Sequence, residues 1–86
     1  MNETLLKQFM TYEMNDYIYD LMIKALDRCR NKIPPELKNF EFNRFEIIID
    51  CEKKIVTITD VLDASEAGIQ EVIISEFENT IKKYKE

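Results

Sequence analysis

Histidine is absent from this sequence of 86 residues, and only one glycine occurs in it. Without histidine the chain lacks the usual general base at neutral pH, and a Ser-His-Asp or Cys-His site is excluded. A single glycine cannot build a glycine-rich phosphate-binding loop. Two cysteines without histidine cannot complete a closed zinc site from this chain alone. The sequence therefore predicts a protein that is not an enzyme and that holds no cofactor or metal.

Cysteine is also scarce, because Cys29 and Cys51 are the only two. Two cysteines fit no disulfide-rich framework. The N-terminus lacks the basic segment and the continuous apolar run of a signal peptide. No run of about 18 apolar residues occurs that would span a membrane. We therefore expect a cytoplasmic protein without membrane contact, in which both thiols are reduced.

The net charge is −5, and this limits the partners that the protein can bind. An acidic domain repels phosphate, so we expect no direct binding to nucleic acid. It can instead occupy the basic groove of a nucleic-acid enzyme or a toxin. The length and the 45% share of hydrophobic residues are typical of one compact globular domain, residues 1–86.

An apolar stripe with steps of three and four residues predicts one long helix over residues 3–32. Pro34 and Pro35 would end this helix, and Asn2 is a candidate N-cap. Asn15 and Asp16 leave an alternative open, in which they cap a second helix. We favour a single helix because the stripe keeps its phase through residue 14. The stripe consists of Met10, Met14, Ile18, Leu21, Met22, Ala25 and Cys29.

Residues 44–59 alternate between apolar and polar side chains, which predicts a β-hairpin. A turn centred on Glu52 and Lys53 would pair residue 49 with 56 and residue 47 with 58. That register places Phe45, Ile47, Ile49, Val56 and Ile58 on one core face. The opposite face is not fully polar, because it carries Phe42, Ile48, Ile55, Thr57 and Thr59.

Residues 64–85 are predicted to form a second helix, so the fold class is α+β in the order α-β-β-α. Asp63 and Glu66 resemble a capping box, and Gly68 leaves a later start of the helix open. The apolar stripe of this helix would be Ile69, Ile73, Phe77, Ile81 and Tyr84.

The first helix carries a second apolar stripe, roughly opposite the first one. It consists of Leu5, Phe9, Tyr12, Tyr19, Ile23 and Leu26, with Asp16 in the gap between the two tyrosines. A helix that is apolar on both sides is covered on both sides. We predict that a partner protein covers this stripe through Leu5, Phe9, Tyr12, Glu13, Asp16, Tyr19, Asp20, Ile23 and Asp27. In the alternative, the final helix and the hairpin cover the first helix from its two sides.

Two groups of side chains offer possible metal ligands. Asp16 and Asp20 are four residues apart, and Asp50, Cys51 and Glu52 lie at the predicted turn. Neither cluster brings a converging ligand from elsewhere in the chain, so we interpret both as solvated surface.

Small, acidic, histidine-free domains occur among immunity proteins, antitoxins and phage-encoded inhibitors. This analogy of size and charge predicts a protein that inhibits or neutralises another protein. The alternative is a homo-oligomeric structural or assembly subunit, in which strand 44–50 pairs with its copy in a homodimer.

Overall fold

The computed structural model describes residues 4–31, 37–63, 65 and 68–86 of the chain. Two short helices come first, four strands follow, and a helix ends the chain, so the α+β class is confirmed. The elements are α1 (Leu5–Tyr12), α2 (Asp16–Arg30), β1 (Leu37–Glu41), β2 (Phe45–Asp50), β3 (Ile55–Asp60), β4 (Ile69–Ile73), α3 (Ile74–Lys82) and the 3-10 turn η2 (Lys83–Lys85).

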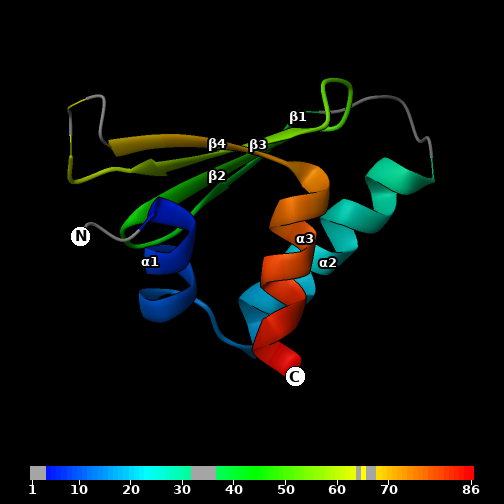
Figure 1. Cartoon of the computed structure of the whole chain (residues 1–86), viewed down its shortest axis with the longest axis horizontal. Helices are drawn as coiled ribbons and strands as arrows, with labels where there is room; N and C mark the ends of the chain where they lie inside the picture. The colour runs from blue at the N-terminus through cyan, green and yellow to red at the C-terminus, as the bar shows by residue number, and fades with distance from the viewer. Residues whose placement is uncertain (1–3, 32–36, 64, 66–67) are drawn as a thin grey trace.

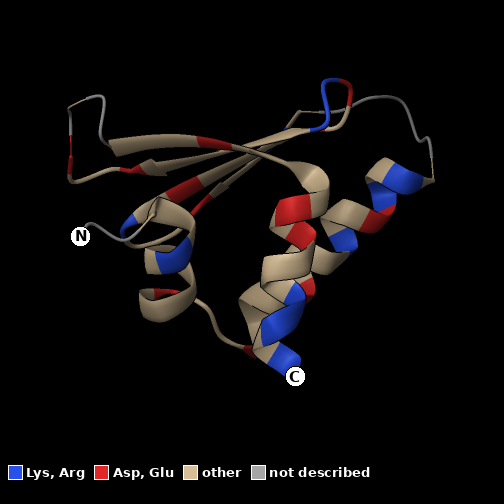
Figure 2. Cartoon of the chain, in the orientation of Figure 1, with Lys and Arg blue, Asp and Glu red and all other residues tan. Residues whose placement is uncertain are grey.

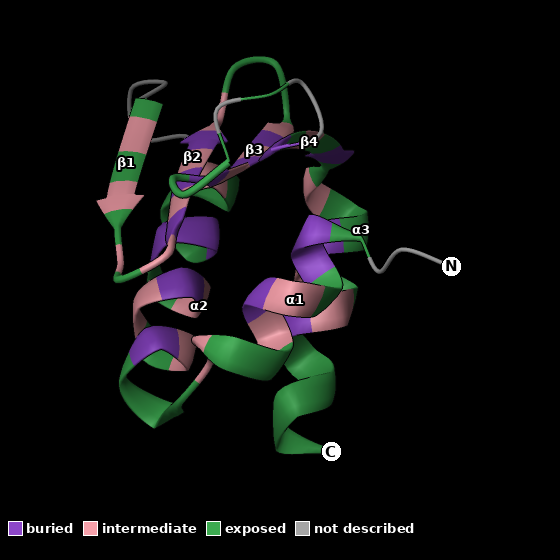
Figure 3. Cartoon of the chain, turned by 90° about the vertical axis from the view of Figure 1, so that its left-hand side faces the viewer, coloured by how far each residue is buried: buried purple, intermediate pink, exposed green. Residues whose placement is uncertain are grey.

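The four strands form one antiparallel sheet in the order β1-β2-β3-β4. The expected pairing of strand 44–50 with its copy is therefore wrong, because β2 already pairs with β1 on one side and with β3 on the other. All three helices lie on the same side of this sheet (Figure 1). The predicted hairpin register is confirmed, because Ile49 pairs with Val56 and Ile47 pairs with Ile58. The predicted core face of the hairpin is also confirmed, since all five of its side chains are fully buried. The core therefore fills the space between the sheet and the helices, where the buried parts of the ribbon lie (Figure 3).

The prediction of one helix over residues 3–32 is wrong, because the first helix ends at Tyr12 and a second helix begins at Asp16. Asn15 caps α2 by accepting a hydrogen bond from the Ile18 amide at 2.9 Å, as in the alternative of two helices. Thr4 caps α1 in the same way, and the expected cap Asn2 lies outside the described residues. Helix α2 ends at Arg30, and the two prolines expected to end it also lie outside the described residues.

The first part of the predicted final helix is a strand instead. Residues 69–73 form β4, in which Val72 is buried opposite Val56. In the predicted capping box, the Asp63 carboxylate accepts hydrogen bonds from the amide and the hydroxyl of Ser65, and Glu66 lies outside the described residues. A Cβ on Gly68 would lie 2.3 Å from the Asp63 carbonyl oxygen, so this close approach requires glycine. The helix starts at Ile74, after the strand has ended.

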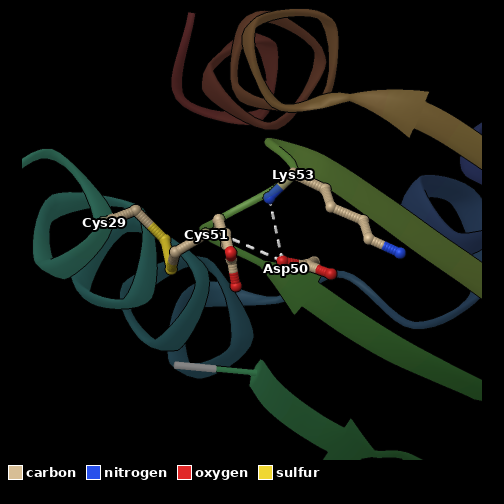
Figure 4. The surroundings of a disulfide bond; sticks show 5 residues. Cys29, Asp50, Cys51 and Lys53 are labelled. Atoms are coloured by element: carbon tan, nitrogen blue, oxygen red, sulfur yellow. Dashed lines mark hydrogen bonds between the residues drawn. A yellow bond between two sulfur atoms is a disulfide. The ribbon is translucent and has the colours of Figure 1, made fainter. Parts of the chain in front are cut away.

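The expectation that both thiols are reduced is wrong, because Cys29 and Cys51 form a disulfide. Cys29 lies in the last turn of α2 and Cys51 follows β2, with 5.2 Å between their Cα atoms (Figure 4). The Asp50 carboxylate shapes this turn by accepting hydrogen bonds from the amides of Glu52 and Lys53. The disulfide thus ties the end of α2 to the turn between β2 and β3. In the described residues, none of the helices has the length and apolar character needed to cross a membrane.

Candidate protein-interaction surface

The two α1 residues at the start of the predicted partner-binding set lie in the core. Leu5 is 8% exposed and Phe9 is fully buried against the rings of Phe42 and Phe45. Their placement on a partner surface is therefore wrong. The break between α1 and α2 changes the direction of the chain, so that α1 turns this part of the stripe toward the sheet.

Arg44, in the turn between β1 and β2, contacts Tyr12 and Glu13 at the end of α1. The Arg44 amide donates a hydrogen bond to the Glu13 carboxylate, and its guanidinium lies 5.6 Å from the centre of the Tyr12 ring. The same guanidinium pairs with the buried Asp60 carboxylate at 3.1 Å. This ion pair raises the pKa of Arg44. Tyr12 stays 64% exposed, whereas Glu13 is partly enclosed by this network.

The C-terminal segment contacts Asp16 and Tyr19, although the Asp16 side chain stays 79% exposed. The Tyr84 hydroxyl and the Lys85 ammonium both donate to Asp16 Oδ1, at 3.0 and 3.2 Å. These contacts lower the pKa of Asp16, with the hydrogen bond from Lys85 as the largest cause. The Tyr84 ring and Lys85 also lie against the ring of Tyr19. This part of the stripe is thus in contact with the 3-10 turn at the end of the chain, and only Tyr19 is partly buried there.

The remaining predicted residues lie further along α2. Ile23 is half-buried and packs against the core. Asp20 and Asp27 are exposed, and Asp27 pairs with Arg30 at 3.3 Å. The predicted set is therefore divided between the core, two intramolecular networks and a few exposed acids.

The structure shows a different surface that the helices leave uncovered, which we name the open face. It is the side of the sheet that points away from the core, and no described helix lies over it (Figure 1). Its twelve outward positions follow from the strand registers and from the burial of the alternate residues. They are Leu37, Asn39, Glu41, Glu46, Ile48, Asp50, Ile55, Thr57, Thr59, Ile69, Glu71 and Ile73.

Five of these twelve side chains are aliphatic, which is unusual for a sheet face without a covering layer. Leu37 is 65% exposed, Ile73 is 59% exposed and Ile69 is 56% exposed. One cross-strand row of this face consists, in order, of Leu37, Asp50, Ile55 and Ile73. A group of exposed aliphatic side chains is typical of a surface that another molecule covers.

The charges of the open face all have one sign. Its twelve positions carry four carboxylates and neither Lys nor Arg. Figure 2 shows the same division, with Lys and Arg gathered mainly on the helices and on the turn between β2 and β3. Glu41 lies directly opposite Glu46 across β1 and β2. Like charges in directly opposed positions destabilise a sheet, and no cation on this face compensates them.

Part of this surface can be predicted from the sequence. The second face of the predicted hairpin is not fully polar, and Ile48 and Ile55 do lie on the open face. The placement of Phe42 on that face is wrong, because it lies in the turn after β1 and packs against Phe9 and the core. The contributions of Leu37, Ile69, Glu71 and Ile73 were missed because β1 was not predicted and β4 was predicted as helix.

Two observations bear on metal-ion chemistry. In the part of the chain that the structure describes, no three His, Cys, Asp or Glu side chains come together to hold a metal ion. Two of the carboxylates that the sequence offers as possible ligands have other contacts, since Asp16 binds the C-terminal segment and Asp50 shapes the turn.

Comparison with protein-family models, with curated proteins and with solved structures finds no match to this chain.

Proposed function

We propose that this chain is a small binding protein, not an enzyme, which neutralises a cationic protein by docking it on the open face. The observation that carries the proposal is the composition of that face. Twelve outward positions hold five aliphatic side chains, four carboxylates and no cation. A partner that binds nucleic acid presents a basic surface, and the open face would occupy it.

The two kinds of side chain on the open face have different roles in this proposal. The aliphatic groups supply apolar area whose burial drives association. The carboxylates select a basic surface, speed the encounter and reject acidic competitors. Glu41 and Glu46 also contribute to the free energy of binding, because their repulsion in the free protein is relieved when a cation of the partner lies between them.

The same charges argue against a homodimer that packs one open face on another. Such a dimer would place four carboxylates against four carboxylates without a cation. The edge strands offer a different route to self-association. β1 and β4 each pair with a neighbour on one side only, within the described strands. Homo-oligomerisation through an edge is therefore our second candidate, and light scattering that shows a monomer at high concentration would remove it.

A cytoplasmic location remains part of the proposal, and the disulfide provides its test. Disulfides persist mainly in oxidising compartments. In a reducing cytoplasm the disulfide of this structure would open, so trapping of thiols in intact cells should find Cys29 and Cys51 largely reduced, although the purified, oxidised protein contains the bond. Trapping that finds them fully oxidised would place the protein in an oxidising compartment instead.

Affinity capture with matched variants tests the proposed function. The bait would be the wild-type protein, a Glu46→Lys/Glu71→Lys variant of the open face, or an Asp20→Lys/Asp27→Lys variant of α2. Both double variants raise the net charge from −5 by four, to −1. We expect a basic protein that the wild type and the α2 variant capture and that the open-face variant does not. Loss with the α2 variant alone would favour the surface predicted from the sequence instead.

A further inference from the structure

A cleft of about 610 Å³ lies between α2 and the edge strand β1, and among the twelve open-face positions only Asn39 lines it. Phe40 lines the cleft from β1, and Leu21 and Ala25 line it from α2. Its volume lies within the range of about 300–1,000 Å³ that is typical of sites for small molecules.

The floor of the cleft is apolar. Ala25 is buried, while Leu21 and Phe40 are half-buried and pack against the core. Phe40 points to the helical side of the sheet, because it pairs with the buried Ile47. The floor can therefore accept an aliphatic or aromatic group of a ligand, which would cover the exposed parts of these side chains.

The rim of the cleft is cationic, in contrast to the protein as a whole. Lys24 and Arg28 lie four residues apart on α2, and Lys38 contributes from β1. Like charges at this helical spacing repel each other. Neither Lys24 nor Arg28 forms an ion pair with another described residue. The rim thus contains two cations that the fold itself does not neutralise.

One carboxylate, Asp27, also lines the cleft. Its Oδ1 accepts a hydrogen bond from Arg30, a residue that pairs with Glu78 of α3 as well. Asp27 is therefore directed toward the end of α2 and does not pair with Lys24 or Arg28. Lys24 and Arg28 therefore leave this part of the rim positive, which suits an anionic head group.

We propose that this cleft binds a small amphipathic carboxylate, whose apolar tail lies on Leu21, Ala25 and Phe40. Its carboxylate accepts hydrogen bonds from Lys24 and Arg28, with Lys38 on the opposite rim. Arginine suits this head group because its planar guanidinium can bind both oxygens of a carboxylate. The proposal concerns a different surface from the open face and does not depend on the protein partner.

Calorimetry and amide chemical shifts during titration with decanoate, below the concentration of micelle formation, test this proposal. The wild type is compared with Lys24→Gln/Arg28→Gln, which removes two exposed charges without touching the core. The control is Lys7→Gln/Lys83→Gln, two exposed lysines that line a separate cleft between α1 and α3. Both double variants lower the net charge by the same amount.

We expect decanoate to shift the amides of residues 21–28 and 38–40, and the Lys24 and Arg28 variant to weaken binding about tenfold or more. The control should bind like the wild type, and decanol, which lacks the charge, should bind at least about tenfold more weakly than decanoate. Equal affinity of both double variants, equal affinity for decanol, or the absence of shifts at these amides would overturn the proposal.

Discussion

Removal of the disulfide should cost this small domain a large part of its stability. The perturbation is the Cys29→Ala/Cys51→Ala double variant, which leaves no unpaired thiol. The two cysteines are 22 residues apart in the sequence, and the bond restricts a loop of that length in the unfolded chain. The chain-entropy relation converts such a loop into about 3 kcal/mol of stability at 25 °C.

That magnitude can be compared with the whole free energy of unfolding. At about 0.05–0.15 kcal/mol per residue, a chain of 86 residues has roughly 4–13 kcal/mol in total. For a domain of this size, 1 kcal/mol corresponds to about 4–8 °C, so the melting temperature should fall by about 12–24 °C. Both cysteines are only half-buried, so lost packing of the sulfur atoms adds little.

Thermal unfolding followed by circular dichroism measures this effect, with and without a reducing agent. The wild type in reductant should melt close to the double variant, while the double variant itself should not respond to reductant. An unchanged melting temperature in the double variant would refute the reasoning. So would two free thiols titrated in the denatured, non-reduced wild type, because the bond would then not exist.

Three further predictions concern single positions. Glu46→Gln should stabilise the free protein by a few tenths of a kcal/mol in urea titrations, because it removes the repulsion with Glu41, and a destabilised variant would contradict this. Gly68→Ala should cost about 1–3 kcal/mol in the same titrations, because its Cβ would overlap the Asp63 carbonyl oxygen, and wild-type stability would show that the turn has more room. Asp16 should titrate below 3.8 by carboxyl NMR and move upward in Lys85→Gln, so that its contribution to stability is complete above the unfolded pKa and is lost as the pH falls through the folded pKa. Identical midpoints in the two proteins would contradict the contact of Asp16 with the C-terminal segment.

The central hairpin could be predicted because its register depends only on local alternation. A shift by one residue would have placed Ile47, Ile49 and Val56 on the outer side of the sheet, so the apolar pattern allows one register. The α+β class followed from the same contrast between alternating and helical periods.

The final segment was misread because a spacing of four residues fits two structures. Ile69, Ile73 and Phe77 lie on one face of a helix, but Ile69 and Ile73 also lie on one face of a strand. The structure forms the strand because Val72 completes the core opposite Val56, and because the Gln70 side chain accepts a hydrogen bond from the Leu6 amide. Both contacts are tertiary and cannot be read from local periodicity.

The break in the first helix and the disulfide were missed for similar reasons. The apolar stripe continues in phase through Met14, although Asn15 carries the capping side chain that starts α2. The approach of Cys29 to Cys51 depends on how α2 packs beside the sheet, and cysteine count alone does not show it. The candidate surface therefore moves from the first helices to the open face, and half of its twelve positions come from β1 and β4, which the sequence did not predict as strands.

The most direct test of the proposed function is the affinity of a purified captured partner for three forms of this protein, measured by calorimetry at low and high salt. We predict that the open-face variant Glu46→Lys/Glu71→Lys loses at least about tenfold in affinity, and that Asp20→Lys/Asp27→Lys, with the same net charge, binds like the wild type at each salt concentration. Equal losses in both variants would show that only the overall charge matters. That result, or a loss confined to the α2 variant, would contradict the assignment of partner binding to the open face.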